Sequence, residues 1–138
     1  MISVRKQEVV KLEDVLHLYQ AVGWTNYTHQ PQMLEQALSH SLAIYLAHDS
    51  DAVVGLVRLV GDGFSSVFVQ DLIVLPSYQR QGIGSCLMKE ALGDFKDAYQ
   101  IQLATEQTEK TLGFYRSLGF ETLSTYDCTG MIWVDRKK

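Results

Sequence analysis

A glycine-containing junction between a strand and a helix carries the residues best suited to hold an anion. The stretch Asp71–Ser85, DLIVLPSYQRQGIGS, runs from an apolar strand through Pro76 to two closely spaced glycines, Gly82 and Gly84. The first turn of a helix leaves backbone N–H groups unpaired, and the helix dipole adds partial positive charge there. Because glycines have no Cβ atom, an anion can come close to these groups, and Arg80 can add a positive charge. The junction is therefore predicted to hold a phosphate or a pyrophosphate.

The spacing of the glycines fits neither of two common nucleotide-binding motifs. A dinucleotide fingerprint, GxGxxG, would need a third glycine where the chain has Leu87. A P-loop needs GxxxxGK followed by serine or threonine, and the chain has no such run. From the glycine spacing alone, a tight turn with no ligand explains the junction equally well.

The composition of the chain is that of one ordinary globular domain. Its 138 residues are 46% hydrophobic and 20% charged, which predicts a single domain over residues 1–138. A net charge of −4 without a basic stripe argues against a nucleic-acid partner. The N-terminus lacks the apolar core of a signal peptide, and no apolar run approaches the roughly 20 residues that span a bilayer, so a cytoplasmic protein without a membrane partner is predicted. The two cysteines, Cys86 and Cys128, form no metal-binding pair and are expected to be reduced and mostly buried.

Hydrophobic periodicity predicts the elements that position the junction. Helices are predicted from Leu12 to Gly23, at Pro31–His40, from the glycines through Phe95, and at Glu109–Leu118. Strands are predicted at Ile2–Arg5, Leu42–His48, Ala52–Val60, Ser66–Val74, Gln100–Thr105, Phe120–Tyr126 and Met131–Val134. Hairpins require antiparallel pairing, whereas the strand–helix–strand unit from Val69 to Thr105 requires a parallel pair. The predicted sheet is therefore mixed.

Two motifs resemble those of the GCN5-related N-acetyltransferase (GNAT) superfamily. QRQGIG, Gln79–Gly84, resembles the acetyl-CoA pyrophosphate loop of that family, Gln/Arg-x-x-Gly-x-Gly/Ala. FYRSLGFE, Phe114–Glu121, resembles a later helix of the family, which has an aromatic pair, a short polar stretch and Leu-Gly-Phe. The resemblance covers roughly residues 66–121 and implies an α/β fold of the α+β type. This is the acyl-CoA N-acyltransferase fold, which has a mixed, mostly antiparallel, splayed sheet with helices on both faces.

The resemblance implies an N-acetyltransferase that moves an acetyl group from its cosubstrate, acetyl-CoA, directly to a primary amine of a small molecule or peptide. It implies no metal. A catalytically silent acyl-CoA-binding or sensor module on the same fold is the main alternative, and a protein-interaction domain without a cofactor is a third interpretation. The acceptor, a preference for a longer acyl-CoA and the oligomeric state stay open, although homodimers are common in the family.

By the same resemblance, the cofactor is expected along the strand, the loop and the later helix. Backbone groups of Leu72, Ile73 and Val74 would bind the pantetheine arm, and one N–H would face the thioester oxygen as in an oxyanion hole. The pyrophosphate would bind at Gln79, Arg80, Gln81, Gly82, Ile83, Gly84 and Ser85. Thr108 stands where the family often has an asparagine that contacts the pantetheine, and a hydroxyl supplies only part of that contact.

The resemblance also suggests the catalytic groups. Tyr115 matches a tyrosine near the CoA sulfur, and a phenol, with a pKa near 10, can donate a proton to the departing thiolate. The alternative for Tyr115 is a core tyrosine with a satisfied hydroxyl. Asp71 is the only acid in the strand before the loop and is the candidate general base, with a purely structural acid as the alternative. Glu106, His29 and His40 are further candidates.

An aromatic segment, GWTNY at residues 23–27, falls in the region where the family binds its acceptor. Trp24 and Tyr27 would line the acceptor site and favour a cation through the faces of their rings. An equally good interpretation is that the two rings cap the core beneath a loop.

Overall fold

The strands form one sheet in which sequence order is spatial order. The structure is a computed structural model that describes residues 1–135 of the 138-residue chain. The strands are β1 (Ile2–Lys6), β2 (Ala43–Asp49), β3 (Ala52–Gly61), β4 (Ser66–Val74) and β5 (Gln100–Leu103). The neighbours from β1 to β4 pair antiparallel, and β4 pairs with β5 in parallel. The mixed, mostly antiparallel sheet predicted from the sequence is confirmed.

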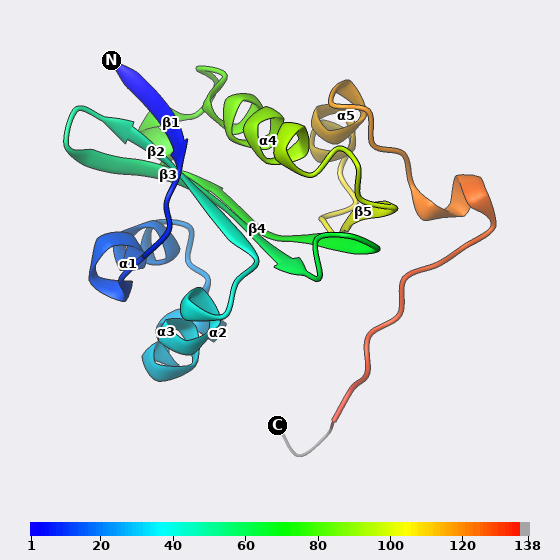
Figure 1. Cartoon of the computed structure of the whole chain (residues 1–138), viewed down its shortest axis with the longest axis horizontal. Coiled ribbons are helices and arrows are strands. Elements are labelled where there is room, and N and C mark those ends of the chain that lie inside the picture. The colour runs from blue at the N-terminus through cyan, green and yellow to red at the C-terminus, as the bar shows by residue number, and fades with distance from the viewer. Residues whose placement is uncertain (136–138) are drawn as a thin grey trace. The chain divides into compact units, whose positions relative to one another are not determined.

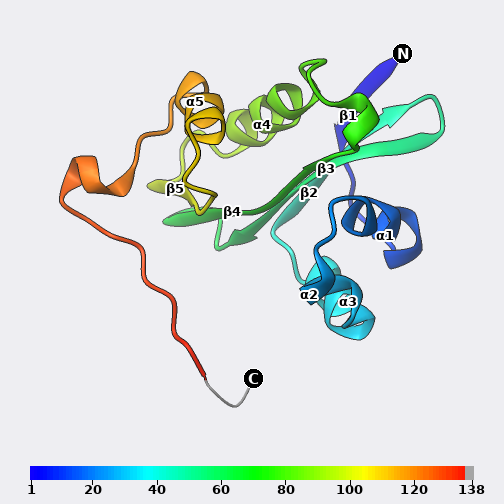
Figure 2. The ribbon, with the colours of Figure 1, turned by 180° about the vertical axis from the view of Figure 1, so that it is seen from behind.

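Helices cover both faces of this sheet. Three helices, α1 (Leu12–Ala21), α2 (Thr25–Thr28) and α3 (Pro31–Ser39), lie on one face, and α4 (Ile83–Asp94) lies on the other (Figures 1 and 2). The chain divides into two compact units, Met1–Leu103 and Ala104–Lys138. The sheet and these four helices all belong to the first unit.

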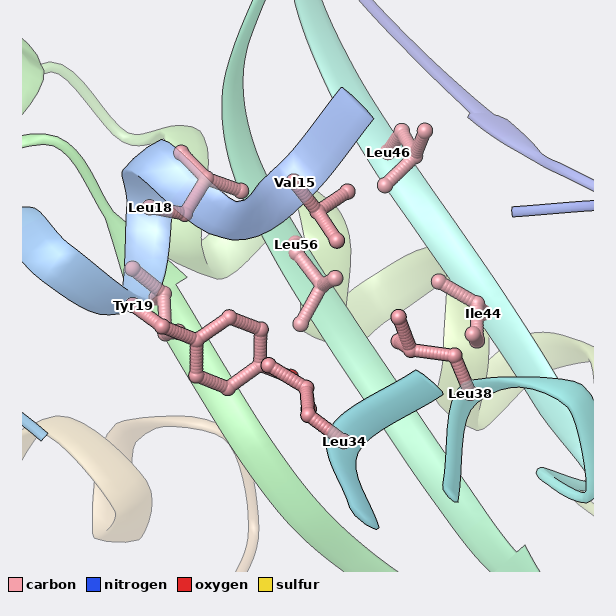
Figure 3. Packing of buried hydrophobic residues seen from close by; sticks show 9 residues of the cluster. Val15, Leu18, Tyr19, Leu34, Leu38, Ile44, Leu46 and Leu56 are labelled. Carbon is pink, nitrogen blue, oxygen red and sulfur yellow. The ribbon is translucent and has the colours of Figure 1, made fainter. Parts of the chain in front are cut away.

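The core beneath α1 and α3 follows from the two periodicities of the sequence. Val15, Leu18 and Tyr19 recur at helical spacing, so α1 buries one stripe against the sheet. Alternation along β2 sends Ile44 and Leu46 to the same face. The complete cluster is Val15, Leu18, Tyr19, Leu34, Leu38, Ile44, Leu46, Leu56 and Ile73 (Figure 3).

The opposite face of the sheet holds α4 close to the strands. Gly55 in β3 permits this approach, because a Cβ atom there would lie 3.2 Å from Leu87 Cδ1 and 3.1 Å from the Ile73 carbonyl oxygen. Tyr45 of β2 also points to this face, and its hydroxyl donates to Asp94 Oδ2 at 2.7 Å at the last residue of α4. The α4 helix therefore lies close to β3 at Leu87 and is hydrogen-bonded to β2 at its last residue, Asp94.

The second unit contains α5 (Glu109–Ser117) and a short 3-10 helix, η2 (Leu123–Tyr126). Thr108 is the N-cap of α5, and its Oγ1 accepts a hydrogen bond from the Thr111 N–H at 3.1 Å. After η2, the chain runs on to Asp135 without helix or strand (Figure 1).

The strands predicted at Phe120–Tyr126 and Met131–Val134 are wrong for this structure. The last four residues of the first range form η2, at the start of which the Thr122 carbonyl accepts from Thr125 N–H and the Thr122 hydroxyl bonds those of Ser124 and Thr125. Such local serine and threonine bonds compete with pairing in a sheet. The second range is apolar enough for a strand, but a strand also needs a neighbour to pair with, and sequence periodicity does not supply one.

Both cysteines are exposed, so the expectation that Cys86 and Cys128 are mostly buried is wrong. Cys86 lies in the first turn of α4, on the side of the helix turned away from the buried stripe of Ile83 and Leu87. Separately, the helices within residues 1–135 are all too short or too polar to cross a membrane.

Candidate active site

A bulge in β4 opens one side of this strand. Arg58 of β3 faces Asp71, but the next residue, Leu59, faces Val69, which leaves Gln70 as the extra residue of a β-bulge. β5 pairs with β4 only over Ser66–Val69. Beyond the bulge, no strand within the described chain pairs with this side of β4. Backbone groups that would be used in a ladder are therefore available to a ligand.

The alternation of the ladder decides which backbone groups reach the open side. Leu75 N–H donates to the Val54 carbonyl at 2.9 Å, so every second residue from Leu75 has its backbone groups on the β3 side. Ile73 is one of these, which places Leu72 and Val74 on the open side. Gln79 Nε2 donates to the Val74 carbonyl at 3.1 Å from that side. Of the three residues expected to bind pantetheine through the backbone, Leu72 and Val74 have the required orientation and Ile73 does not.

The loop between β4 and α4 presents a row of free backbone donors. The 3-10 helix η1 (Pro76–Tyr78) is held to the end of β2, since the Tyr78 hydroxyl donates to Asp49 Oδ2 at 2.6 Å. Within the described chain, no hydrogen bond is formed by the N–H groups of Gln81, Gly82, Ile83, Gly84 or Ser85. The first helical bond is from Cys86 N–H to the Gly82 carbonyl, at 3.0 Å. These free donors lie at the N-terminus of α4, the positive end of its dipole, which is the arrangement that binds anions.

Gly82 gives this loop both its conformation and its access. It is the N-cap of α4 with φ of 81°, a left-handed conformation that glycine adopts without steric cost. A Cβ atom built on Gly82 would have no neighbour within 4 Å, so the space beside it is open. Arg80, which also has a positive φ of 65°, is exposed and forms no ion pair with the described residues. The loop can therefore add one positive charge to the row of donors.

Asp71 lies in a buried network on the face of the sheet that α1 and α2 cover. Only 3% of Asp71 is exposed, and Arg58 Nε and the Tyr19 hydroxyl donate to its Oδ2 at 2.7 and 2.8 Å. The Tyr27 hydroxyl donates to Oδ1 at 3.1 Å. Burial, with the Asp71 charge, raises the pKa of Tyr19 well above the ordinary range, so Tyr19 remains a donor. With its carboxylate engaged by three donors, Asp71 fits the structural alternative better than that of a free general base.

Arg58 is the member of this network that the sequence reasoning missed. Its Nη2 donates to the Tyr27 hydroxyl at 3.1 Å, and its Nη1 donates to Ser41 Oγ at 3.3 Å. The side chain of Arg58 is 5% exposed. The available signal was a lone arginine within the apolar strand AVVGLVRLV, at a position able to face the lone acid of the next strand.

Trp24 and Tyr27 form an aromatic group with Tyr19 at the edge of the core. The centroids of Tyr19 and Tyr27 lie 5.1 Å apart, and those of Trp24 and Tyr27 lie 6.3 Å apart. Both Trp24 and Tyr27 are half-buried and pack against the hydrophobic cluster. The Arg58 guanidinium already stands 5.9 Å from the centre of the Tyr27 ring. This arrangement favours core capping for Tyr27, because the protein's own cation occupies a face of its ring.

Tyr115 lies in the second unit, in an aromatic group of its own. Its ring centroid is 5.0 Å from that of Phe114 and 5.9 Å from that of Phe120, both in edge contact. Burial raises the pKa of Tyr115, an effect opposed in part by a hydrogen bond with Thr105. The phenol is therefore protonated at neutral pH, as a proton donor must be.

The other predicted residues have local structural roles or stand in solvent. The Thr108 hydroxyl caps α5 and donates to Thr111 Oγ1 at 2.8 Å, which uses the donor expected for pantetheine. His40 Nδ1 lies 2.8 Å from the Gln36 carbonyl oxygen at the end of α3. His29 and Glu106 are exposed.

Comparisons with known proteins show which family the chain resembles. Residues 40–122 match a family model described as an acetyltransferase (GNAT) domain. The chain is 32% identical over 95 residues to serotonin N-acetyltransferase 2, chloroplastic, of Oryza sativa subsp. japonica, covering 66% of this chain and 48% of the relative. It is 28% identical over 137 residues to GCN5-related N-acetyltransferase 1, chloroplastic, of Arabidopsis thaliana, covering 97% and 68%. The chain thus spans about half the length of the rice relative.

A solved structure is similar over the whole chain. A GNAT-family acetyltransferase from Streptococcus pneumoniae TIGR4 is 82% identical, with a TM-score of 0.92 and coverage of 99% of both chains. The resemblance inferred from the two motifs is therefore confirmed, as is the acyl-CoA N-acyltransferase fold that it implied.

Proposed function

Because the chain belongs to the GNAT acetyltransferase family, we propose that it transfers an acetyl group from acetyl-CoA directly to a primary amine of a small molecule or peptide. The observation that carries the proposal is the row of free N–H groups from Gln81 to Ser85, placed directly after the open side of β4. The pyrophosphate would bind these groups, with Arg80 beside it, and the pantetheine would run along Leu72 and Val74. No metal takes part in this proposal.

The reaction needs an attacking amine, a stabilised oxyanion and a proton for the leaving group. The amine nitrogen attacks the thioester carbon, and a backbone N–H on the open side of β4 would stabilise the charge that develops on the oxygen. When the carbon–sulfur bond breaks, the thiolate of CoA would take the phenol proton of Tyr115. The amine must also lose a proton, and exposed Glu106 is a better candidate to receive it than Asp71, whose carboxylate accepts from three donors. Asp71 would then act as a positioning residue for Tyr27 and Arg58.

The variant Tyr115→Phe tests the assigned acid. We expect kcat for acetyl transfer to fall by about 100-fold or more, since general acid catalysis typically contributes that much. The KM for acetyl-CoA should change little, because the phenol acts on the leaving group. Thiol release is the measurement, and Tyr126→Phe, which changes an exposed tyrosine of the same unit, is the matched control. An unchanged rate in Tyr115→Phe would refute the acid role.

The amine panel for these assays should begin with arylalkylamines. The rice relative is named for serotonin, an amine of that class. Thiol release with any amine in the panel would support an enzyme. Binding of acetyl-CoA without thiol release across the panel would instead support the silent acyl-CoA-binding module.

Cys86 offers a direct probe of the proposed pyrophosphate site. Its thiol is exposed in the first turn of α4, and helical side chains point back toward the N-terminus. Saturating acetyl-CoA should slow alkylation of Cys86 by about 10-fold at ten times Kd, in proportion to the free protein that remains. Cys128, exposed in the second unit, is the internal control and should react at its original rate. Equal rates at Cys86 with and without acetyl-CoA would argue against a cofactor at this turn.

The proposal extends to the organisation of the chain. We treat the two units as one domain over residues 1–138, since the family match at 40–122 crosses the boundary at Leu103. We also propose a cytoplasmic location, a homodimer, and no nucleic-acid or membrane partner. The net charge of −4 supports the exclusion of nucleic acid.

A further inference from the structure

A side-chain contact joins the start of the proposed pyrophosphate site to β2. The Tyr78 hydroxyl, in η1, donates to Asp49 Oδ2 at 2.6 Å, and Asp49 is the last residue of β2. Tyr78 directly precedes the segment Gln79–Ser85, which we call the pyrophosphate loop. The contact therefore ties the beginning of this loop to the end of a central part of the sheet.

Main-chain hydrogen bonds to the sheet stop before the pyrophosphate loop begins. The last one is from Leu75 N–H to the Val54 carbonyl at 2.9 Å. The first bond within α4 is from Cys86 N–H to the Gly82 carbonyl at 3.0 Å. The loop between them contains two glycines, so many conformations are open to it and holding one of them costs entropy. A row of donors that binds an anion tightly needs such a restraint.

The contact between Tyr78 and Asp49 is charge-assisted at neutral pH. The hydrogen bond from Tyr78, together with the amino group of Met1 at 3.1 Å from Oδ1, lowers the pKa of Asp49, so its carboxylate is charged. The same hydrogen bond raises the pKa of Tyr78, so its hydroxyl keeps the proton that it donates. Hydrogen bonds to a carboxylate are stronger than those between neutral groups, which makes this contact a suitable restraint.

Neither member of the pair is suited to bind the pyrophosphate itself. Tyr78 has one hydroxyl proton, which it donates to Asp49. Asp49 is an anion and would repel a phosphate, so charge alone predicts that removing its carboxylate strengthens the binding of acetyl-CoA. A role in holding the loop predicts weaker binding instead. The two effects have opposite signs and can be told apart.

We propose that Asp49 is a positioning residue for acetyl-CoA, which acts through Tyr78 to hold the free N–H groups of the pyrophosphate loop in their binding arrangement. The inference rests on the proposed function, because it takes the loop to be the site of the pyrophosphate. Without the contact, the free protein would spend a smaller fraction of its time in this arrangement. If that fraction fell to about a tenth, the Kd for acetyl-CoA would rise by about tenfold.

Calorimetric titration of the full chain with acetyl-CoA tests the proposal. Tyr78→Phe and Asp49→Ala should each raise Kd by about tenfold. The two changes together should also raise Kd by about tenfold rather than about a hundredfold, because both remove the same contact. Asp49→Asn should recover most of the affinity, since its amide oxygen can still accept the Tyr78 proton.

Tyr45→Phe is the matched control for this series. The Tyr45 hydroxyl donates to Asp94 Oδ2 at 2.7 Å, so it forms the same kind of contact at the other end of α4. Its removal should leave Kd for acetyl-CoA unchanged, whatever it costs in stability. Urea unfolding of every variant measures that stability. A Kd that follows stability across the series, Tyr45→Phe included, would show a general structural role and overturn the proposal.

Steady-state kinetics with an accepted amine gives a second readout. The KM for acetyl-CoA should rise in Tyr78→Phe while kcat changes little, because the lost restraint serves binding before and during the reaction alike. An unchanged Kd in Tyr78→Phe, tighter binding in Asp49→Ala, or losses that multiply in the double variant would each overturn this inference and leave the proposed function standing. A wild-type chain that does not bind acetyl-CoA would overturn both.

Discussion

The Gly82→Asp, Gly84→Asp variant is expected to lose at least about 100-fold in affinity for acetyl-CoA, since each lost charge-assisted hydrogen bond typically costs about 1.5–3 kcal/mol. The two new carboxylates would stand beside the free N–H groups of the α4 terminus and repel the pyrophosphate. The side chain on Gly82 would also occupy the open space through which an anion approaches. Calorimetric titration with acetyl-CoA measures the change.

Folding of this variant is not expected to fail, which keeps the test interpretable. Aspartate is among the residues that best tolerate a left-handed backbone, so the φ of 81° at position 82 remains accessible. The matched control is Gly93→Asp, which adds an acid near the other end of the same helix, at a position where a Cβ atom meets nothing within 4 Å. The control should bind acetyl-CoA like wild type. If the double variant also binds normally, the glycines serve only the turn, and the cofactor site must be sought elsewhere.

The sheet and the glycine-containing turn before α4 could be predicted from the sequence because local signals determine them. Short apolar runs bounded by turn residues mark β2, β3 and β4, and the turns between them enforce antiparallel pairing. The glycines mark the start of α4, because Gly82 adopts a left-handed N-cap conformation that glycine accommodates without steric cost and leaves open space beside the turn. The strands, the turns between them and the start of α4 each depend on residues that are close together in the sequence.

The features that could not be predicted depend on contacts between residues that are far apart in the sequence. The bulge at Gln70 depends on the register between β3 and β4, and this register decides that Leu72 and Val74, rather than Ile73, face the open side of the strand. The strand expected at Met131–Val134 failed because its pattern says nothing of a partner. The buried network joins residues that are 13 to 52 positions apart, and only the folded chain brings them together.

The variant Arg58→Met is expected to lose about 3–5 kcal/mol of the free energy of unfolding, the typical cost of removing one partner of a buried ion pair. Arg58 and Asp71 are both almost fully buried, with Arg58 Nε 2.7 Å from Asp71 Oδ2. Methionine keeps most of the side-chain volume but leaves the Asp71 charge without a cation. Urea unfolding measures the loss, which is large beside the roughly 5–15 kcal/mol that stabilises an ordinary domain. Arg5→Met, at an exposed arginine of β1, is the matched control and should stay near wild type.

The double variant Arg58→Met, Asp71→Leu separates a specific pair from general damage to the core. Removing both charges also removes the buried, uncompensated carboxylate, so the double variant should be more stable than Arg58→Met alone. It should remain below wild type, because the buried Tyr19 hydroxyl loses its acceptor at a cost of about 1–3 kcal/mol. A double variant no more stable than Arg58→Met would show that the loss in the single variant does not come from an unpaired Asp71 carboxylate. A double variant more stable than the single one would show that Arg58 and Asp71 act as a pair, within the network that also contains Tyr19 of α1 and Tyr27 of α2.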